Sequence, residues 1–214
     1  MDVSKGPAIT VLASIFMVLA TLTIATRIYV RAFMIKSLGL DDYVMVFAYL
    51  FYLAYLITQL VGVSYGIGQH WYNLEETRRQ TALMCWWLCE VFYAPTTTLL
   101  KVSVGFFLLR ICVKKIQIWI IRFFIAGSMV CGTIYLLLIL FQCSPVSYWW
   151  DLNPENTGKC VSPLAFAVLS WIISVLNSFA DLTFAIIPMF MVAQTTMSTR
   201  TRIAVCILLG IASM

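Results

Sequence analysis

The strongest constraint on this chain is a series of apolar runs, each long enough to cross a lipid bilayer as a helix. Five complete runs cover residues 8–29, 43–63, 83–109, 118–140 and 164–192, and a sixth covers residues 203–214. A helix of about 20 apolar residues spans the roughly 30 Å hydrocarbon core of a bilayer. We therefore expect an all-α membrane protein, a transmembrane helix bundle that forms a single domain over residues 1–214.

The number and spacing of the runs favour a bundle of the seven-helix type. The sixth run stops at the final residue, so we expect the sixth span to be incomplete and the seventh to be absent from this chain. The first run is too long for a signal peptide and lacks a small-residue cleavage pattern, so we expect it to be a retained span.

The composition is incompatible with a soluble domain. The chain is 62% hydrophobic and 11% charged, whereas soluble domains carry about 25% charged residues. A soluble domain of this length has too little interior to bury such an apolar excess, so membrane lipid is the expected partner of much of the surface. Basic residues are not interleaved with aromatic residues in any run, which argues against a nucleic-acid partner.

The distribution of basic residues predicts the orientation in the membrane. The first, third and fifth connections carry Arg27, Arg31, Lys36, Arg110, Lys114, Lys115, Arg122, Arg200 and Arg202, whereas the N-terminus and the second and fourth connections carry Lys5, Arg78, Arg79 and Lys159. Lysine and arginine are favoured on the cytoplasmic side of membrane proteins. The N-terminus is therefore expected outside, in a plasma membrane or an endomembrane.

Two cysteines in the fourth connection are candidates for a disulfide. Cys143 and Cys160 lie on the predicted outer, oxidising side. A loop of about 17 residues closed in this way would stabilise the fold by about 3 kcal/mol. Two alternatives remain open from the sequence: both thiols stay free, or one pairs with Cys85 or Cys89 near the outer end of the third run.

Lys101 and Asp181 are ionisable residues inside otherwise apolar runs. Both lie somewhat past the middle of spans that run in the same direction, so they are expected at similar depth. A charge at that depth is costly unless it is paired or hydrated. We predict an interhelical ion pair, which Asn177, one turn from Asp181, can join. Such a pair serves either as a switch or ion relay, or as a clamp that fixes helix packing.

Glu90 and the two aspartates before the second run are further candidates. Glu90 is expected near the outer end of the third span, either lining a cavity or solvated among lipid headgroups. Asp41 or Asp42 is expected to cap the second helix, and both complement the positive end of its dipole.

Catalysis finds no support in the motifs. There is no GxSxG, HExxH or phosphate-binding glycine loop, and one histidine cannot build the usual metal sites. We expect no enzyme activity, no metal and no cofactor.

The ordered motifs resemble the fungal rhodopsin-like domain family, which includes satratoxin-cluster-type membrane proteins. The matching segments are RIYVRAF (27–33), LGLDDYVMV (38–46), GIGQH (66–70), EVFYAPTTTLLKVSVGFFLLRI (90–111), FQCSPVSYWWD (141–151), GKC (158–160) and DLTFAIIP (181–188). The resemblance implies a seven-helix membrane protein, and some members look like G-protein-coupled receptors. The recurrent polar positions of the family fall on Arg27, Arg31, Asp41, Asp42, Lys101, Cys143, Cys160 and Asp181, none with a settled chemical role. A retinal pigment would need a lysine on the last helix, so retinal is not expected.

Three functions are compatible with these features. The leading hypothesis is receptor-like sensing of a small extracellular ligand, with basic inner loops facing a cytoplasmic G protein or anionic lipid. The second is a transporter or channel that uses Lys101 and Asp181 along its path. The third, which rests on the resemblance, is an accessory membrane protein of secondary metabolism.

Overall fold

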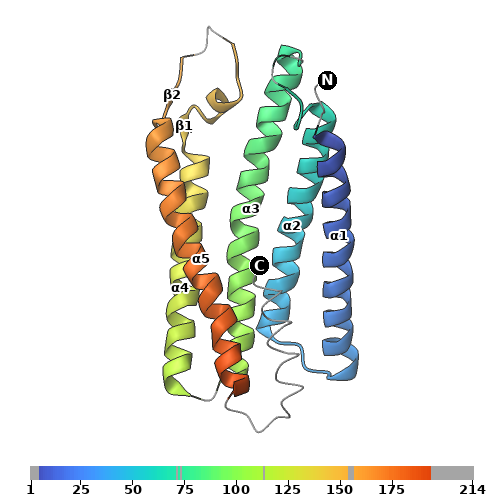
Figure 1. Ribbon diagram of the computed structural model, residues 1–214, viewed down its shortest axis with the longest axis vertical. Helices are drawn as coiled ribbons and strands as arrows, with labels where there is room; N and C mark the ends of the chain where they lie inside the picture. The colour runs from blue at the N-terminus through green and yellow to red at the C-terminus, as the bar shows by residue number, and fades with distance from the viewer. Residues whose placement is uncertain (1–4, 71, 73, 113, 154–156, 194–214) are drawn as a thin grey trace.

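The computed structural model of the protein is a bundle of long helices (Figure 1). It describes residues 5–70, 72, 74–112, 114–153 and 157–193, so the predicted sixth span lies outside the described residues. The helices are α1 (Gly6–Tyr29), which continues into the π-helical turn η1 (Val30–Met34), α2 (Leu40–Tyr65), α3 (Glu76–Ile111), α4 (Lys115–Leu140) and α5 (Pro163–Ala193). Between α4 and α5 lie β1 (Cys143–Ser144), the 3₁₀ turn η3 (Val146–Trp149) and β2 (Lys159–Cys160).

Within the described part of the chain, five helices are long and apolar enough to span a membrane. This confirms the prediction of an all-α, multi-pass membrane protein. The helices extend beyond the apolar runs that predicted them, most clearly in α3, which begins at Glu76 rather than near residue 83. Residues 76–82 are polar but include good helix formers such as glutamate, arginine and alanine, so the helix continues past the hydrocarbon boundary.

Successive helices run in opposite directions (Figure 1). The start of α1, the connection between α2 and α3, and the β1–β2 hairpin lie at one end, which we call the hairpin end. The connections between α1 and α2 and between α3 and α4 lie at the opposite end. The backbone N–H of Lys5 donates to the carbonyl of Gly68 at 2.9 Å, which ties the start of α1 to the α2–α3 connection.

Both ends of α2 follow from local sequence. Its N-cap is Gly39, whose backbone N–H donates to the Asp42 carboxylate at 3.1 Å. An aspartate therefore does bind a free N–H at this end, although from the first turn rather than from the cap position itself. The helix stops at Gly66, whose φ of 117° is left-handed and suits glycine.

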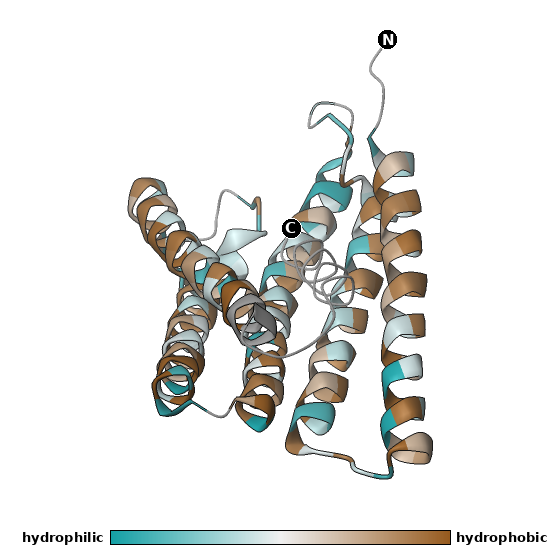
Figure 2. Ribbon diagram, turned by 60° about the horizontal axis from the view of Figure 1, so that its bottom comes forward, coloured by the Kyte–Doolittle hydropathy of each residue, from teal (hydrophilic) through white to brown (hydrophobic). Residues whose placement is uncertain are grey.

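Helix α3 is the central element of the bundle (Figures 1 and 2). In its most apolar window 33% of the residues are buried, against 6–11% in the other four membrane-spanning helices. Figure 2 shows apolar residues on the outward faces of the helices, and Leu22 of α1, for example, is 59% exposed. The apolar residues that soluble proteins bury thus face lipid here, and α3 carries most of the protein–protein packing.

Small residues let α3 and α4 approach closely. A Cβ added at Gly132 of α4 would overlap the Thr98 side chain of α3, and one added at Gly105 of α3 would overlap Ile125 of α4. Close backbone approach at small residues is a common way for membrane helices to associate, because lipid supplies no hydrophobic driving force between them. The pair of glycines therefore sets the α3–α4 spacing beside the cavity described below.

This packing predicts that Gly132→Ala destabilises the protein. Both the Thr98 hydroxyl and its methyl group lie where the new Cβ would go, so rotation of that side chain brings no relief, and overpacking costs about 1–3 kcal/mol. Gly127→Ala on the same helix is the matched control, since nothing lies within 4 Å of a Cβ at that position. In thermal unfolding of detergent-solubilised protein, Gly132→Ala should lower Tm and Gly127→Ala should leave it unchanged or slightly higher. Equal effects of the two changes would contradict the packing argument.

Candidate functional site

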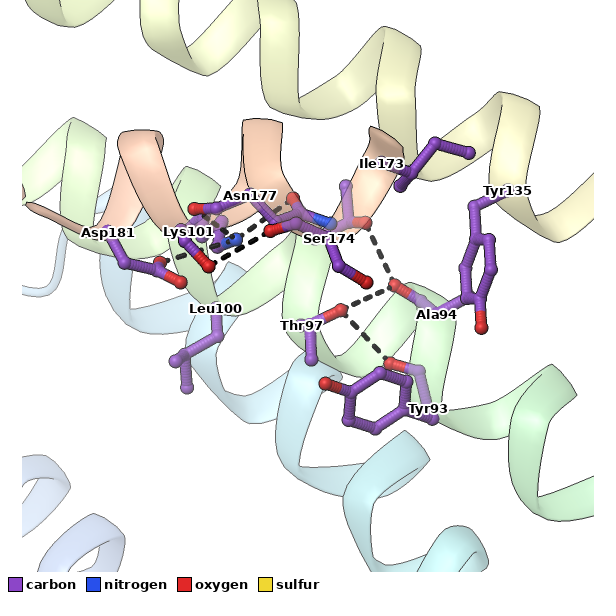
Figure 3. Close-up of a pocket in the computed structure, with 13 residues that line it drawn as sticks. Tyr93, Ala94, Thr97, Leu100, Lys101, Tyr135, Ile173, Ser174, Asn177 and Asp181 are labelled. Carbon is purple, nitrogen blue, oxygen red and sulfur yellow. Dashed lines mark hydrogen bonds and ion pairs between the residues drawn. The ribbon is translucent and has the colours of Figure 1, made fainter. Parts of the chain in front are cut away.

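The buried lysine of α3 reaches across to α5. Lys101 Nζ lies 3.2 Å from Asp181 Oδ1 and donates to Asn177 Oδ1 at 3.0 Å and to the Asn177 carbonyl at 3.4 Å (Figure 3). The structure therefore brings together the three residues Lys101, Asn177 and Asp181 that the sequence had placed at similar depth. Asn177 and Asp181 are four residues apart, so they lie on one face of α5.

The two charges differ in their exposure. The Lys101 side chain is 9% exposed, whereas that of Asp181 is 51% exposed in the described structure. The ammonium group depends on its α5 partners because burial removes its water. The contact with Lys101 is made by one carboxylate oxygen, Oδ1. The pair is thus a buried cation held by a half-exposed anion.

A cavity of about 290 Å³ opens beside this pair. Its wall is formed by side chains of α3, α4 and α5, with Lys101 and Asp181 toward one end and Tyr93 and Tyr135 toward the other (Figure 3). The remaining lining residues are Ala94, Thr97, Thr98, Leu100, Gly132, Ile173, Ser174, Asn177 and Ser178. This polar lining at membrane depth is suited to a small ligand with hydrogen-bonding groups.

Glu90 does not line this cavity. It lies on α3 toward the hairpin end, and its Oε1 accepts a hydrogen bond from Trp86 Nε1 at 2.9 Å. Its Oε2 is buried and has no hydrogen-bond partner among the described residues. The structure therefore places Glu90 apart from Lys101, about three helical turns along the same helix.

A second charged cluster joins α1, α2 and α3 at the opposite end of the bundle. Arg27 lies 3.0 Å from Asp41 and 3.1 Å from Asp42, and Arg31 lies 3.6 Å and 3.9 Å from the same two carboxylates. The aspartate side chains are only 5% and 4% exposed. The two guanidinium groups lie 5.3 and 5.5 Å from the centre of the Phe107 ring of α3, within cation–π range.

This Arg–Asp cluster also contains a hydrogen bond from α3. The Ser103 hydroxyl, which is fully buried, donates to the Asp41 carbonyl at 2.7 Å. These four charged residues correspond to recurrent polar positions of the family that the sequence resembles. From the aspartates, the sequence predicted only capping of the second helix and a favourable interaction with its dipole. A sequence signal for the pairing exists: Arg27 and Arg31 are four residues apart on one helix face, and two adjacent acids follow across a short turn.

The disulfide predicted in the connection between α4 and α5 is present between Cys143 and Cys160. It joins β1 to β2, which pair in an antiparallel register with these two residues opposite each other. Cys85 and Cys89 are free, so the alternative pairings are wrong. The loop lies above the adjoining ends of α4 and α5 (Figure 1), and its Trp150 packs against Trp87 of α3 at 5.3 Å between ring centroids.

No cluster of three or more histidine, cysteine, aspartate or glutamate side chains suited to a metal occurs in the residues that the structure describes.

Comparison with known proteins identifies one family. The fungal rhodopsin domain matches the chain over residues 26–214. No curated protein and no solved structure matches the chain.

The unequal exposure of Lys101 and Asp181 predicts unequal effects of removing either one. Asp181→Leu leaves a buried ammonium group without its counterion, whereas Lys101→Met leaves a half-exposed carboxylate on the cavity wall. Asp181→Leu should therefore lower Tm more than Lys101→Met. The double variant should be more stable than Asp181→Leu alone, because no unpaired charge remains. Strictly additive effects in the double variant would show that the two side chains are not coupled.

Removal of the disulfide should weaken the fold through the outer loop. The sequence separation of Cys143 and Cys160 is 17, and a cross-link of this length contributes about 3 kcal/mol. Cys143→Ser, Cys160→Ser and the double change should lower Tm by similar amounts. Cys131→Ser is the control, because Cys131 is a free thiol. An unchanged Tm in all three disulfide variants would contradict the prediction.

Proposed function

Because the chain belongs to the fungal rhodopsin domain family, we propose that it is a receptor-like membrane protein that senses a small ligand. The ligand occupies the cavity between α3, α4 and α5. The observation that carries this proposal is the position of the Lys101–Asp181 pair, which forms part of the cavity wall and also links α3 to α5. A ligand that contacts this pair changes the contact between α3 and α5 and therefore the relative position of the two helices.

We propose that the hairpin end lies outside the membrane and that the helices belong to a seven-helix bundle. Two features support it. The Cys143–Cys160 disulfide lies at the hairpin end, and disulfides persist in oxidising compartments. Exposed basic residues at the opposite end, Lys114, Lys115 and Arg122, suit the cytoplasmic side, where they face anionic lipid or a G protein. The plasma membrane and the endomembranes both provide these two environments.

The Lys101–Asp181 link is suited to signalling because ligand binding can favour one of two arrangements of α5. A ligand shifts a conformational equilibrium only by its difference in affinity for the two states. A group bound at Asp181 changes the polar contact that holds α5 to α3. An apolar cluster that includes Leu108, Ile121 and Phe184 holds the same helices together from Ala180 onward. Motion of α5 is then expected on the side of Asp181 that leads toward Ser174.

A transporter or channel is the second candidate function. It is favoured by the polar stripe on α5, where Ser174, Asn177, Ser178 and Asp181 recur at helical spacing along the cavity. A transporter would move its substrate past these residues, whereas a receptor would bind it without net flux.

The receptor proposal predicts saturable binding in the cavity without transport. In a thermal-shift screen of small amines, carboxylates and neutral alcohols on the full chain in nanodiscs, a compound that binds should stabilise the protein. At 100-fold excess over Kd the stabilisation is about 2.7 kcal/mol. Ser178→Phe fills the cavity and should abolish this shift. Leu176→Phe is the matched control, because Leu176 is 49% exposed on α5 and is not a lining residue.

Two outcomes would overturn the receptor proposal. Equal ligand-induced shifts in Ser178→Phe and Leu176→Phe would place the binding site elsewhere. Time-dependent accumulation of the bound compound in proteoliposomes, lost in Asp181→Asn, would favour the transporter.

A further inference from the structure

Three hydroxyl groups on the cavity wall, those of Thr97, Thr98 and Ser178, present acceptors rather than donors. Thr97 Oγ1 donates to the carbonyls of Tyr93 at 3.2 Å and Ala94 at 3.1 Å, and Thr98 Oγ1 donates to the Ala94 carbonyl at 2.8 Å. On α5, Ser178 donates to the Ser174 carbonyl at 2.9 Å. A hydroxyl has one hydrogen to donate and two lone pairs. Since each hydrogen is directed to backbone of its own helix, the lone pairs remain for a ligand.

The ammonium group of Lys101, the one cationic side chain among the lining residues, already has its hydrogen-bond partners. An ammonium group has three donors and no acceptor. The three contacts of Lys101 Nζ are those with Asn177 Oδ1, the Asn177 carbonyl and Asp181 Oδ1. An incoming anion would have to displace these partners and would approach a carboxylate at the same time. The site therefore disfavours a carboxylate or phosphate ligand at Lys101.

Asp181 is the charged group of the wall that can accept further hydrogen bonds. An ionised carboxylate accepts at two oxygens with about four lone-pair sites. Lys101 is the partner of Oδ1, and no described residue hydrogen-bonds to Oδ2. The side chain is 51% exposed and lines the cavity. Of the lining donors, the amide NH2 of Asn177 and the Ser174 hydroxyl are neutral, and the Tyr93 and Tyr135 hydroxyls lie toward the other end (Figure 3).

We propose that the ligand of this cavity is a small organic cation with N–H donors, such as a protonated primary amine, seated with its ammonium group on Asp181. The inference rests on the proposed function and specifies its ligand class. The acceptor lone pairs of Thr97 and Ser178 receive further donors of the same group. The tyrosine rings at the other end provide apolar and π surface for the organic part of the molecule. A cavity of about 290 Å³ has room for an amine with one aromatic ring.

The charge preference of the cavity can be measured with a cysteine placed in its wall. The full chain carrying Ser178→Cys, in nanodiscs, is reacted with aminoethyl methanethiosulfonate, which is cationic, and with sulfonatoethyl methanethiosulfonate, which is anionic. Each rate is divided by the rate of the same reagent with free cysteine. The protein without Ser178→Cys gives the background from the described cysteines outside the disulfide, Cys85, Cys89, Cys112 and Cys131, together with Cys206.

We expect the normalised rate ratio to favour the cationic reagent by about tenfold or more, as for a unit charge beside a partly buried carboxylate. Adding Asp181→Asn should bring the ratio to one or below, because the amide keeps the shape, removes the negative charge and leaves the Lys101 ammonium in the wall. Any difference in the reactivity of the thiol itself affects both reagents and cancels in the ratio. A ratio that does not respond to Asp181→Asn would overturn the inference.

A competition experiment tests the same inference without a change at Asp181. Phenethylamine should slow modification of the Ser178→Cys thiol in a concentration-dependent way, whereas phenylacetate, of similar shape and opposite charge, should not. Equal protection by the two compounds, no protection by phenethylamine, or faster reaction of the anionic reagent would refute the cation preference while leaving an accessible cavity. Failure of both reagents to react would show a closed site and would overturn the proposed function together with its ligand class.

Discussion

Lipid offers no hydrogen-bond partner, so each polar side chain inside the bundle needs one within its own helix or on a neighbouring helix. In the described chain α3 takes part in several of the polar contacts that join different helices. Lys101 reaches α5, and Ser103, only two residues on, donates to the backbone of α2. Phe107 then lies under the guanidinium groups of the α1–α2 connection. Within two turns the central helix therefore contacts elements on both of its sides, and the position of each outer helix depends on α3.

The Arg–Asp cluster shows how this requirement is met for adjacent like charges. Asp41 and Asp42 are both almost fully buried, and two neighbouring carboxylates repel each other at such a site. Each guanidinium contacts both acids, so Arg27 and Arg31 neutralise the pair together rather than one by one. Planar guanidinium groups also stack on an aromatic ring, which lysines at these positions would do less well. The cluster therefore holds the short α1–α2 connection against α3.

The parts of the structure that were predictable from the sequence are those that depend only on residue type and position along the chain. Apolar runs predicted the helices, and the depth of Lys101 and Asp181 along their runs predicted their contact. The placement of Cys143 and Cys160 on the predicted oxidising side predicted the disulfide. The Arg–Asp pairing has a sequence signal in the spacing of its residues, but the contact also depends on how η1 turns the chain toward α2, and it was missed. The cavity was missed because its volume depends on the approach of α4 at Gly132, which has no periodicity to detect.

The asymmetry of the Lys101–Asp181 pair bears on whether it acts as a clamp or as a switch. A pure clamp is most effective when both charges are buried and neither has capacity for another partner. Here the cation is buried and saturated, while the anion is half exposed and keeps a free oxygen. Loss of the pair would leave the buried Lys101 ammonium group without a counterion, whereas an added partner at Asp181 leaves no charge unpaired. A bound ammonium group would therefore share the carboxylate with Lys101, weaken the direct contact without abolishing it, and leave Asn177 to hold the lysine. In that arrangement Asn177 would still join α5 to α3, the Asp181 side of α5 would be able to shift, and every buried charge would stay paired, which is the condition that a membrane interior imposes on any switch.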